Sequence, residues 1–315
     1  SEGNCTMTAF VVSICSAAIV YAVSILYAAI GEIFTQRSGI MNLGIEGIML
    51  MGAVSGFLTV YNTNNLGLAI LVVILVGALL GLVFAFFTVT LRADQTVCGM
   101  AFLIFGSGLS GFIGKNITGI ATSVKFQKIE IPLLSQIPII GDIFFKHDIL
   151  VYLMYLIVPL SMFYIYRTKP GLILRALGEN PAALDKAGIN VFLLRYIYVM
   201  FGCAMAAISG ACISLSYTNF WNEGMTGGKG WIAFSLVAFS GWNPAGAALG
   251  ALLFGAISIT GINMQIYLPG IPSQFYSMLP YLATVIALII TTGSFRKKRS
   301  EEPTALCQSY DRENR

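Results

Sequence analysis

The sequence predicts an all-α protein, a polytopic transmembrane helical bundle with about 8–10 membrane segments that include half-helix or re-entrant pieces. The chain has 315 residues, of which 57% are hydrophobic, and its mean hydropathy of +0.82 is far above that of a soluble domain. Long stretches carry no Asp, Glu, Lys, Arg or His, among them 47–91 and 230–295. A spanning helix needs about 20 apolar residues, so each of these stretches must cross more than once. The run 68–87 lacks the apolar–polar alternation of a β-barrel strand, so helices are expected.

Turn signals bound the candidate membrane segments. Clusters of Gly, Pro and Asn, such as YNTNNLG at 61–67 and SGWNPAG at 240–246, interrupt the apolar runs. The segment 231–241 is too short to cross alone, so we expect a half-helix or a re-entrant piece there. The expected segments are 8–30, 43–61, 67–91, 96–114, 149–166, 195–218, 231–241, 245–262 and 275–294.

Basic residues in the loops predict the orientation. The loop 167–195 and the run FRKKRS at 295–300 are rich in Lys and Arg near segment ends, so both are expected in the cytoplasm. An even number of crossings must then separate them, which requires that 231–241 completes a crossing together with its flanks. The same count places the loop 115–148 and the N-terminus outside.

Two regions follow from this topology. Residues 1–295 are expected to form a single transmembrane domain, with an outer loop over about 115–148 and a cytoplasmic loop over about 167–195. Residues 296–315 form a basic and polar cytoplasmic tail, whose composition permits disorder.

Motifs for nucleotide or metal chemistry lack the context they need. GSGLSG at 106–111 fits a dinucleotide-binding pattern by letter but lies inside an apolar run, where small residues for close helix packing explain it better. GGKGW at 227–231 resembles the end of a phosphate-binding loop, yet no Ser or Thr follows the Lys. The six cysteines are scattered and His147 is the single histidine, so a metal site is not expected. We expect no cofactor in this chain.

A few polar residues are candidates for lining a path through the membrane. Glu46 precedes a long uncharged run, where an acid is costly and usually faces a cavity or a partner. It could instead be an interfacial structural acid, paired with a residue such as Arg37. Asn42 and Asn243 are further candidates, and Gln265 could also meet a polar solute. For such residues, interfacial anchoring or hydrogen bonding between helices is the more common role.

The segment RALGENPAALDKAGINV at 175–191 is unusually polar for this chain. Asn180 suits the N-cap of a helix, Pro181 its first position and Gly188 its C-terminal cap, so the spacing predicts a short helix over 181–187. Such a helix could dock in a groove on a partner protein, or it could simply join two membrane segments.

Four stretches resemble a known family. GEIFTQRSGIMNLGIEGIMLMGA at 31–53, the segment at 175–191, GGKGWIAFSLVAFSGWNPAGAALGALLFGA at 227–256 and MLPYLATVIALI at 278–289 are similar to permease subunits of ATP-binding cassette importers for nucleosides. These subunits belong to the wider ribose and branched-chain amino acid permease group. The opening motif looks like that of the shorter of two related permeases that pair as a heterodimer.

The resemblance implies partners and site residues. Separate ATPase subunits would bind ATP and Mg²⁺, so this chain would be a transport subunit rather than an enzyme. An extracytoplasmic lipoprotein or periplasmic binding protein would deliver the solute, and a second, related permease would complete the pore. The cytoplasmic segment would be the coupling helix seated in the ATPase, with the following contact candidates: Gly178, Glu179, Asn180, Pro181, Ala182, Ala183, Leu184 and Gly188.

Alternating access powered by the ATPases is the expected mechanism, with nucleosides as the solute and the bacterial cytoplasmic membrane as the location. The path would include Asn42, Glu46 and Asn243. One alternative is an ion-coupled secondary transporter with Glu46 as its ion site, although intramembrane ionisable residues are scarce. Others are an ATP-driven permease for a sugar, a flavin or another small polar solute, and a membrane scaffold without transport activity.

Overall fold

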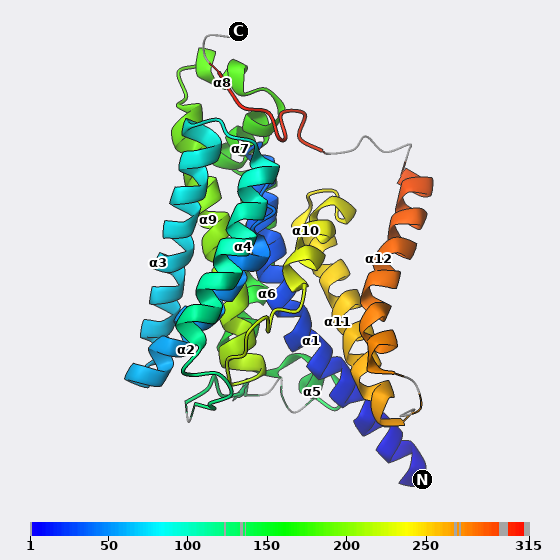
Figure 1. Ribbon diagram of the computed structural model, residues 1–315. Helices are drawn as coiled ribbons and strands as arrows, with labels where there is room; N and C mark the ends of the chain where they lie inside the picture. Colours follow the sequence, from blue (N-terminus) through cyan, green and yellow to red (C-terminus); the bar gives the residue numbers. More distant parts are fainter. Residues whose placement is uncertain are drawn as a thin grey trace.

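The computed structural model describes residues 2–122, 124–132, 135, 137–267, 270, 272–295 and 302–311, and these form a bundle of long helices (Figure 1). The long helices are α1 (Glu2–Arg37), α2 (Ile45–Thr63), α3 (Leu66–Ala85), α4 (Gln95–Gly114), α6 (Ile149–Arg167), α9 (Val191–Cys212), α11 (Pro244–Tyr267) and α12 (Ser273–Phe295).

Shorter elements join them. The helices α5 (Ile140–Phe144), α7 (Lys169–Glu179), α8 (Pro181–Lys186) and α10 (Lys229–Phe239) lie between the long ones. The π-helical turns Phe86–Thr90 and Ile213–Tyr217 continue α3 and α9, and the strands β1 (Ile129–Glu130) and β2 (Lys146–His147) pair antiparallel.

Within the described residues, seven helices are long and apolar enough to cross a membrane, which confirms the predicted polytopic bundle. The first span reaches Arg37 rather than ending near residue 30. The polar side chains at the end of this helix find hydrogen-bond partners within the protein. Gln36 Nε2 donates to Glu32 Oε1 over 3.0 Å, and Arg37 Nε donates to the carbonyl of Trp242 over 3.0 Å. Because these groups have buried partners, the helix continues past the uncharged run.

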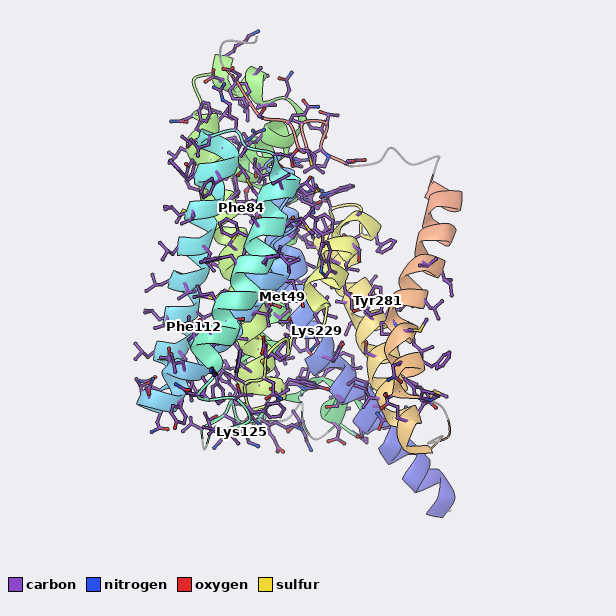
Figure 2. All side chains as sticks on the ribbon, viewed as in Figure 1. Met49, Phe84, Phe112, Lys125, Lys229 and Tyr281 are labelled. Carbon is purple, nitrogen blue, oxygen red and sulfur yellow. The ribbon has the colours of Figure 1, made fainter. Side chains whose placement is uncertain are left out.

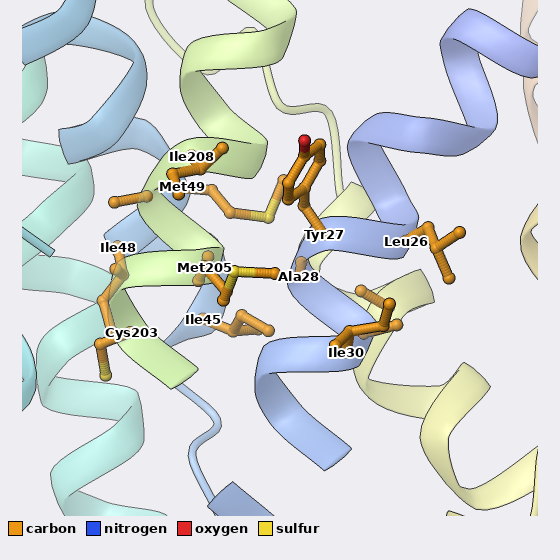
Figure 3. Packing of buried hydrophobic residues seen from close by; sticks show 14 of the residues in the cluster. Leu26, Tyr27, Ala28, Ile30, Ile45, Ile48, Met49, Cys203, Met205 and Ile208 are labelled. Carbon is orange, nitrogen blue, oxygen red and sulfur yellow. The ribbon is translucent and has the colours of Figure 1, made fainter. Parts of the chain in front are cut away.

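The core lies where α1, α2 and α9 pack together (Figure 3). Tyr27, Met49 and Met205 are among the buried side chains there. Small residues allow the close approach: a side chain at Gly52 would collide with the backbone of Ala207 on α9. Lipid tails are as apolar as the side chains, so the hydrophobic effect does not drive helices together inside a membrane. Close van der Waals packing of one helix backbone on another stabilises the bundle instead.

The glycines of the GSGLSG motif also serve packing. A Cβ at Gly106 would lie 2.5 Å from the carbonyl oxygen of Gly47, whereas one at Gly108 would meet open space. Gly106 therefore holds α4 against α2, as the packing explanation of the motif predicts.

The bundle has two distinct ends. The helices α7 and α8 and residues 302–311 lie at one end, and the N-terminus and α5 lie at the other (Figure 1). After α9, the loop near Thr218 and Trp221 is at the far end, where it bridges to residues after α4. The chain then rises to α10, descends along α11 and returns along α12 (Figure 1). The segment 231–241 falls mainly within α10, which is shorter than a membrane span, so its crossing together with its flanks stays a prediction.

Part of the expected tail is folded against the bundle. Residues 302–311 pack on the α8 end, with Ala305 only 5% and Tyr310 only 8% exposed. This differs from the disorder that the tail's composition permits, because these residues find partners on segments far away in the sequence. The rest of the tail, including the basic residues 296–300, lies outside the described residues.

Candidate functional site

The first turns of α2 and α10 meet inside the bundle rather than at its ends. Met49, one turn into α2, and Lys229, the first residue of α10, both lie at mid-height (Figure 2). Glu46 joins the two helices: its carboxylate accepts hydrogen bonds from Gly228 N over 2.8 Å and Gly230 N over 2.6 Å. Thr226 Oγ1 donates to the same carboxylate over 2.5 Å. A carboxylate at a helix N-terminus satisfies free N–H groups and interacts favourably with the helix dipole.

The glycines of GGKGW make this junction possible. Gly227 and Gly228 have φ of +56° and +83°, which is the left-handed region that favours glycine. A Cβ at Gly230 would lie 2.6 Å from Glu46 Oε2. The motif that resembles a phosphate loop therefore forms a tight turn for an internal carboxylate.

Lys229 is buried beside this junction. Its side chain is only 6% exposed, and its Nζ lies 4.0 Å from the centre of the Tyr21 ring and 5.0 Å from that of Tyr217. The two rings meet edge to face at 5.9 Å. Cation–π attraction thus offsets part of the cost of holding an ammonium group at membrane depth.

A polar cavity of about 230 Å³ lies next to the Tyr21 ring. Its lining comes from α1, the start of α10, α11 and α12: Tyr21, Gly227, Ile232, Ser258, Ile262, Gln265, Tyr276, Pro280 and Tyr281. Ser258 is 94% buried, since only 6% of it is exposed, and its hydroxyl makes no hydrogen bond of normal geometry within the described residues. Tyr281 donates from its hydroxyl to the carbonyl of Gly227 over 3.3 Å.

The chemistry of this cavity suits a small, uncharged solute. Among the described residues, its lining has no acidic or basic side chain. Aromatic faces can stack on a ring, and the Ser258 hydroxyl and the Gln265 amide can hydrogen-bond to its polar edge. The volume lies below the roughly 300–1,000 Å³ of pockets for drug-sized ligands, so the solute must be compact.

Comparison with known proteins identifies the family. Residues 14–289 match the family described as branched-chain amino acid transport system / permease component. The chain belongs to this permease family. It is a permease subunit of an ATP-binding cassette transporter.

Relatives of the permease are named as transporters of different solutes. The guanosine ABC transporter permease protein NupQ of Bacillus subtilis is 35% identical, over 86% of this chain and 89% of its own. The nucleoside ABC transporter permease protein NupC of Lactococcus lactis is 34% identical, over 87% of this chain and 90% of its own. TsgC13 of Haloferax volcanii, named as a putative glucose ABC transporter permease protein, is 34% identical over 96% of this chain and 99% of its own. No solved structure matches the permease significantly.

The short helix predicted over residues 181–187 of the permease is present as α8. Asn180 Oδ1 accepts from Ala183 N over 3.0 Å, Pro181 opens the helix, and Gly188 has a φ of +81°. The caps predicted from the sequence are therefore confirmed. We call residues 178–188 the coupling segment, after the role that the family resemblance implies for it.

Burial divides the predicted contact residues of the coupling segment. Gly178 and Leu184 are buried and anchor the segment to the bundle, and Pro181 and Ala182 are half-buried. The exposed members are Glu179, Asn180, Ala183 and Gly188. Only this second group presents free surface to a partner, and its contact with an ATPase stays a prediction.

The three residues predicted for the path serve local structure in the permease. Asn42 Oδ1 accepts from Gly44 N over 2.9 Å, and Asn243 Oδ1 accepts from Ala245 N over 3.0 Å. Glu46 caps α10 and is not paired with Arg37. Their role in a path stays a prediction, because nothing beyond these bonds points to solute contact.

Sequence reasoning missed most of the cavity. It named Gln265 among residues that could meet a polar solute, but not Tyr21, Ser258 or Tyr281. One signal was available: Lys229 is the only charged residue between Glu223 and Arg296. A lone lysine between glycines ahead of a half-helix marks a place where the chain turns inside the membrane.

Proposed function

We propose that this permease imports nucleosides by alternating access. Separate ATPase subunits would hydrolyse ATP at the α8 end, and an extracytoplasmic binding protein would deliver the solute at the opposite end. A second permease subunit would complete the translocation path. In this proposal the membrane is the bacterial cytoplasmic membrane and the C-terminus faces the cytoplasm, as the basic loops indicate.

The observation that carries the choice of solute is the uncharged, tyrosine-lined cavity beside α10. A nucleobase can stack on Tyr21 or Tyr281 and hydrogen-bond to Ser258 and Gln265. The names of the two nucleoside-permease relatives support the same choice. Two discontinuous helices that meet near mid-height also agree with a solute site at that depth.

The exposed face of α8 supports coupling to a soluble ATPase. Glu179, Asn180 and Ala183 are exposed at the end of the bundle, while Leu184 is buried beneath the helix. Because the permease itself performs no covalent chemistry in this scheme, closure of the ATPases would move the coupling segment and shift the bundle between its two open states.

An ion-coupled mechanism with Glu46 as the ion site is disfavoured. Three donors from Thr226, Gly228 and Gly230 already occupy its carboxylate. An ion bound there would compete with these three donors for the two oxygens, and displacing a buried donor is costly. Glucose is the second candidate solute, since TsgC13 aligns with nearly the whole chain.

The test is uptake into vesicles that contain the complete importer, with labelled guanosine and labelled glucose in parallel. We expect ATP-dependent accumulation of guanosine, blocked by excess unlabelled guanosine and not by glucose. Tyr281→Ala should raise the KM for guanosine, whereas Tyr281→Phe should stay close to wild type because the stacking face remains. Phe112→Ala, at a residue 77% exposed on α4, is the matched aromatic control. Accumulation of glucose instead of guanosine would contradict the proposal.

A further inference from the structure

The tail residues 302–311 contact the coupling segment directly. Ala305 N donates to the carbonyl of Gly178 over 2.8 Å, and Thr304 Oγ1 donates to the carbonyl of Glu179 over 2.6 Å. Tyr310 donates from its hydroxyl to Asp185 Oδ2 on α8 over 3.0 Å. The tail therefore binds the coupling segment both before α8 and within it.

The same residues are fixed to the connection between α1 and α2. Cys307 N donates to the carbonyl of Gly39 over 3.2 Å. Arg195, buried at the start of α9, donates from Nη1 to the carbonyl of Gln308 over 3.2 Å and from Nε to the carbonyl of Ser38 over 3.2 Å. One arginine thus ties the tail and the α1–α2 connection together.

An ion pair fixes the far end of the tail to the connection between α3 and α4. The two Nη atoms of Arg92 lie 2.6 and 3.0 Å from the two carboxylate oxygens of Asp311. This bidentate geometry favours one orientation of the pair. Its side chains are 43% and 23% exposed, so the pair contributes little to global stability.

Packing shows that the tail is seated on the bundle rather than lying loosely over it. Tyr310 packs against Phe192 with ring centres 5.9 Å apart, and both Tyr310 and Ala305 are buried. In Figure 1 the tail, in red, crosses the end of the bundle that carries α7 and α8.

We infer that residues 302–311, which we call the strap, position the coupling segment for energy transfer. The helix α8 has six residues, too few to be stable alone. The strap holds it against the α1–α2 connection, which leads into Glu46 and α10. Movement of α8 by an ATPase is then passed to the membrane helices rather than lost in a flexible loop. This inference rests on the proposed coupling function, and it makes Arg92, Tyr310 and Asp311 positioning residues.

The first test needs neither solute nor ATPase. A negative result would therefore count against the strap alone and not against the proposed transport function. Amide hydrogen exchange over 181–188 is measured on the permease in lipid nanodiscs. We expect exchange to rise about two- to fivefold in Asp311→Asn and about tenfold or more when 302–315 are deleted. Ser309→Ala, at an exposed strap residue, should match wild type.

Exchange within α11 reports whether each variant remains folded. If the deletion variant fails to fold, Asp311→Asn and the exchanged pair Arg92→Asp with Asp311→Arg decide the question. The exchanged pair should restore protection. Unchanged exchange over 181–188 in both Asp311→Asn and any folded deletion variant would overturn the inference.

A second readout separates positioning from a structural role alone. In vesicles holding the complete importer, Tyr310→Phe and Asp311→Asn should lower the amount of solute imported per ATP hydrolysed about two- to fivefold, while the complex stays assembled. An unchanged ratio in both variants would show that the strap plays no part in coupling.

Discussion

At the residue scale, Glu46 is a buried polar link between α2 and α10. It connects α2 to α10 through donors that lie about 180 positions later in the chain. Glu46→Ala leaves buried N–H groups and a hydroxyl without an acceptor, so we expect a loss of about 2–4 kcal/mol in the free energy of unfolding. Glu46→Gln, which keeps one acceptor oxygen, should lose less. Thermal unfolding of the purified permease measures both variants.

Equal stability of Glu46→Ala and wild type would contradict this account of the junction. Thr63→Ala, at the exposed far end of α2, serves as the control for an ordinary loss of a hydroxyl group.

His147 predicts a pH dependence in the loop that joins α4 and α6. Its side chain is buried, its Nε2 pairs with the carbonyl of Ile143 over 2.6 Å, and its Nδ1 has no partner within the described residues. Burial lowers the pKa of His147 below its ordinary value of 6.5. The folded loop thus favours neutral His147, so its stability is full above about pH 6.5, falls as the pH drops below that value, and levels off below the lower folded pKa.

Hydrogen exchange over 140–148 at about pH 7.5 and about pH 5, corrected for the intrinsic rate, tests this dependence. Protection should be lower at the acid pH in wild type. It should be insensitive to pH in His147→Gln. A loop equally protected at both pH values in wild type would show that the burial of His147 has no such effect.

At the element scale, close helix crossings depend on single glycines. Gly52 lets α2 approach the backbone of α9 at Ala207, and a larger side chain there must push the helices apart. We expect Gly52→Leu to cost more than about 3 kcal/mol, enough to reduce the amount of folded permease in the membrane sharply. Gly108→Leu, which would enter open space on α4, is the matched control. Size-exclusion chromatography of both variants provides the comparison.

The elements that sequence reasoning predicted well are those with local signals. Asn180, Pro181 and Gly188 act within a few positions of each other, so their order alone defines α8. The glycine motifs likewise indicate close packing without naming the partner helix. The segment 231–241 was recognised as incomplete because its length falls below that of a span.

Contacts between distant segments could not be predicted in the same way. Nothing near Glu46 in the sequence indicates that Gly228 and Gly230 will donate to it. The strap is a second case: its composition suggests a solvated tail, yet Asp311 pairs with Arg92 and Tyr310 with Asp185 once the fold brings them together. The cavity beside Tyr21 combines four separate helices, and its uncharged lining leaves no motif.

At the scale of the whole molecule, the proposed solute site and the proposed coupling surface of the permease lie at different heights along the bundle. Lys229 at the α2–α10 junction and Tyr281 of the cavity lining lie at mid-height of the bundle (Figure 2), and the coupling segment with its strap lies at one end (Figure 1). In the proposed function, the exposed residues Glu179 and Asn180 would therefore contact the ATPase at a distance from the solute site. Changing them should uncouple ATP hydrolysis from uptake while the bundle stays folded.

The most direct measurement is guanosine accumulation in vesicles that contain the ATPase subunits, the binding protein and the permease pair. Wild type should accumulate guanosine only with ATP and the binding protein present. Glu179→Ala and Asn180→Asp, which keeps a side-chain cap for α8, should reduce accumulation about tenfold or more while ATP hydrolysis continues. Uptake that is unchanged in both variants, or that persists without ATP and collapses with a proton uncoupler, would contradict the account.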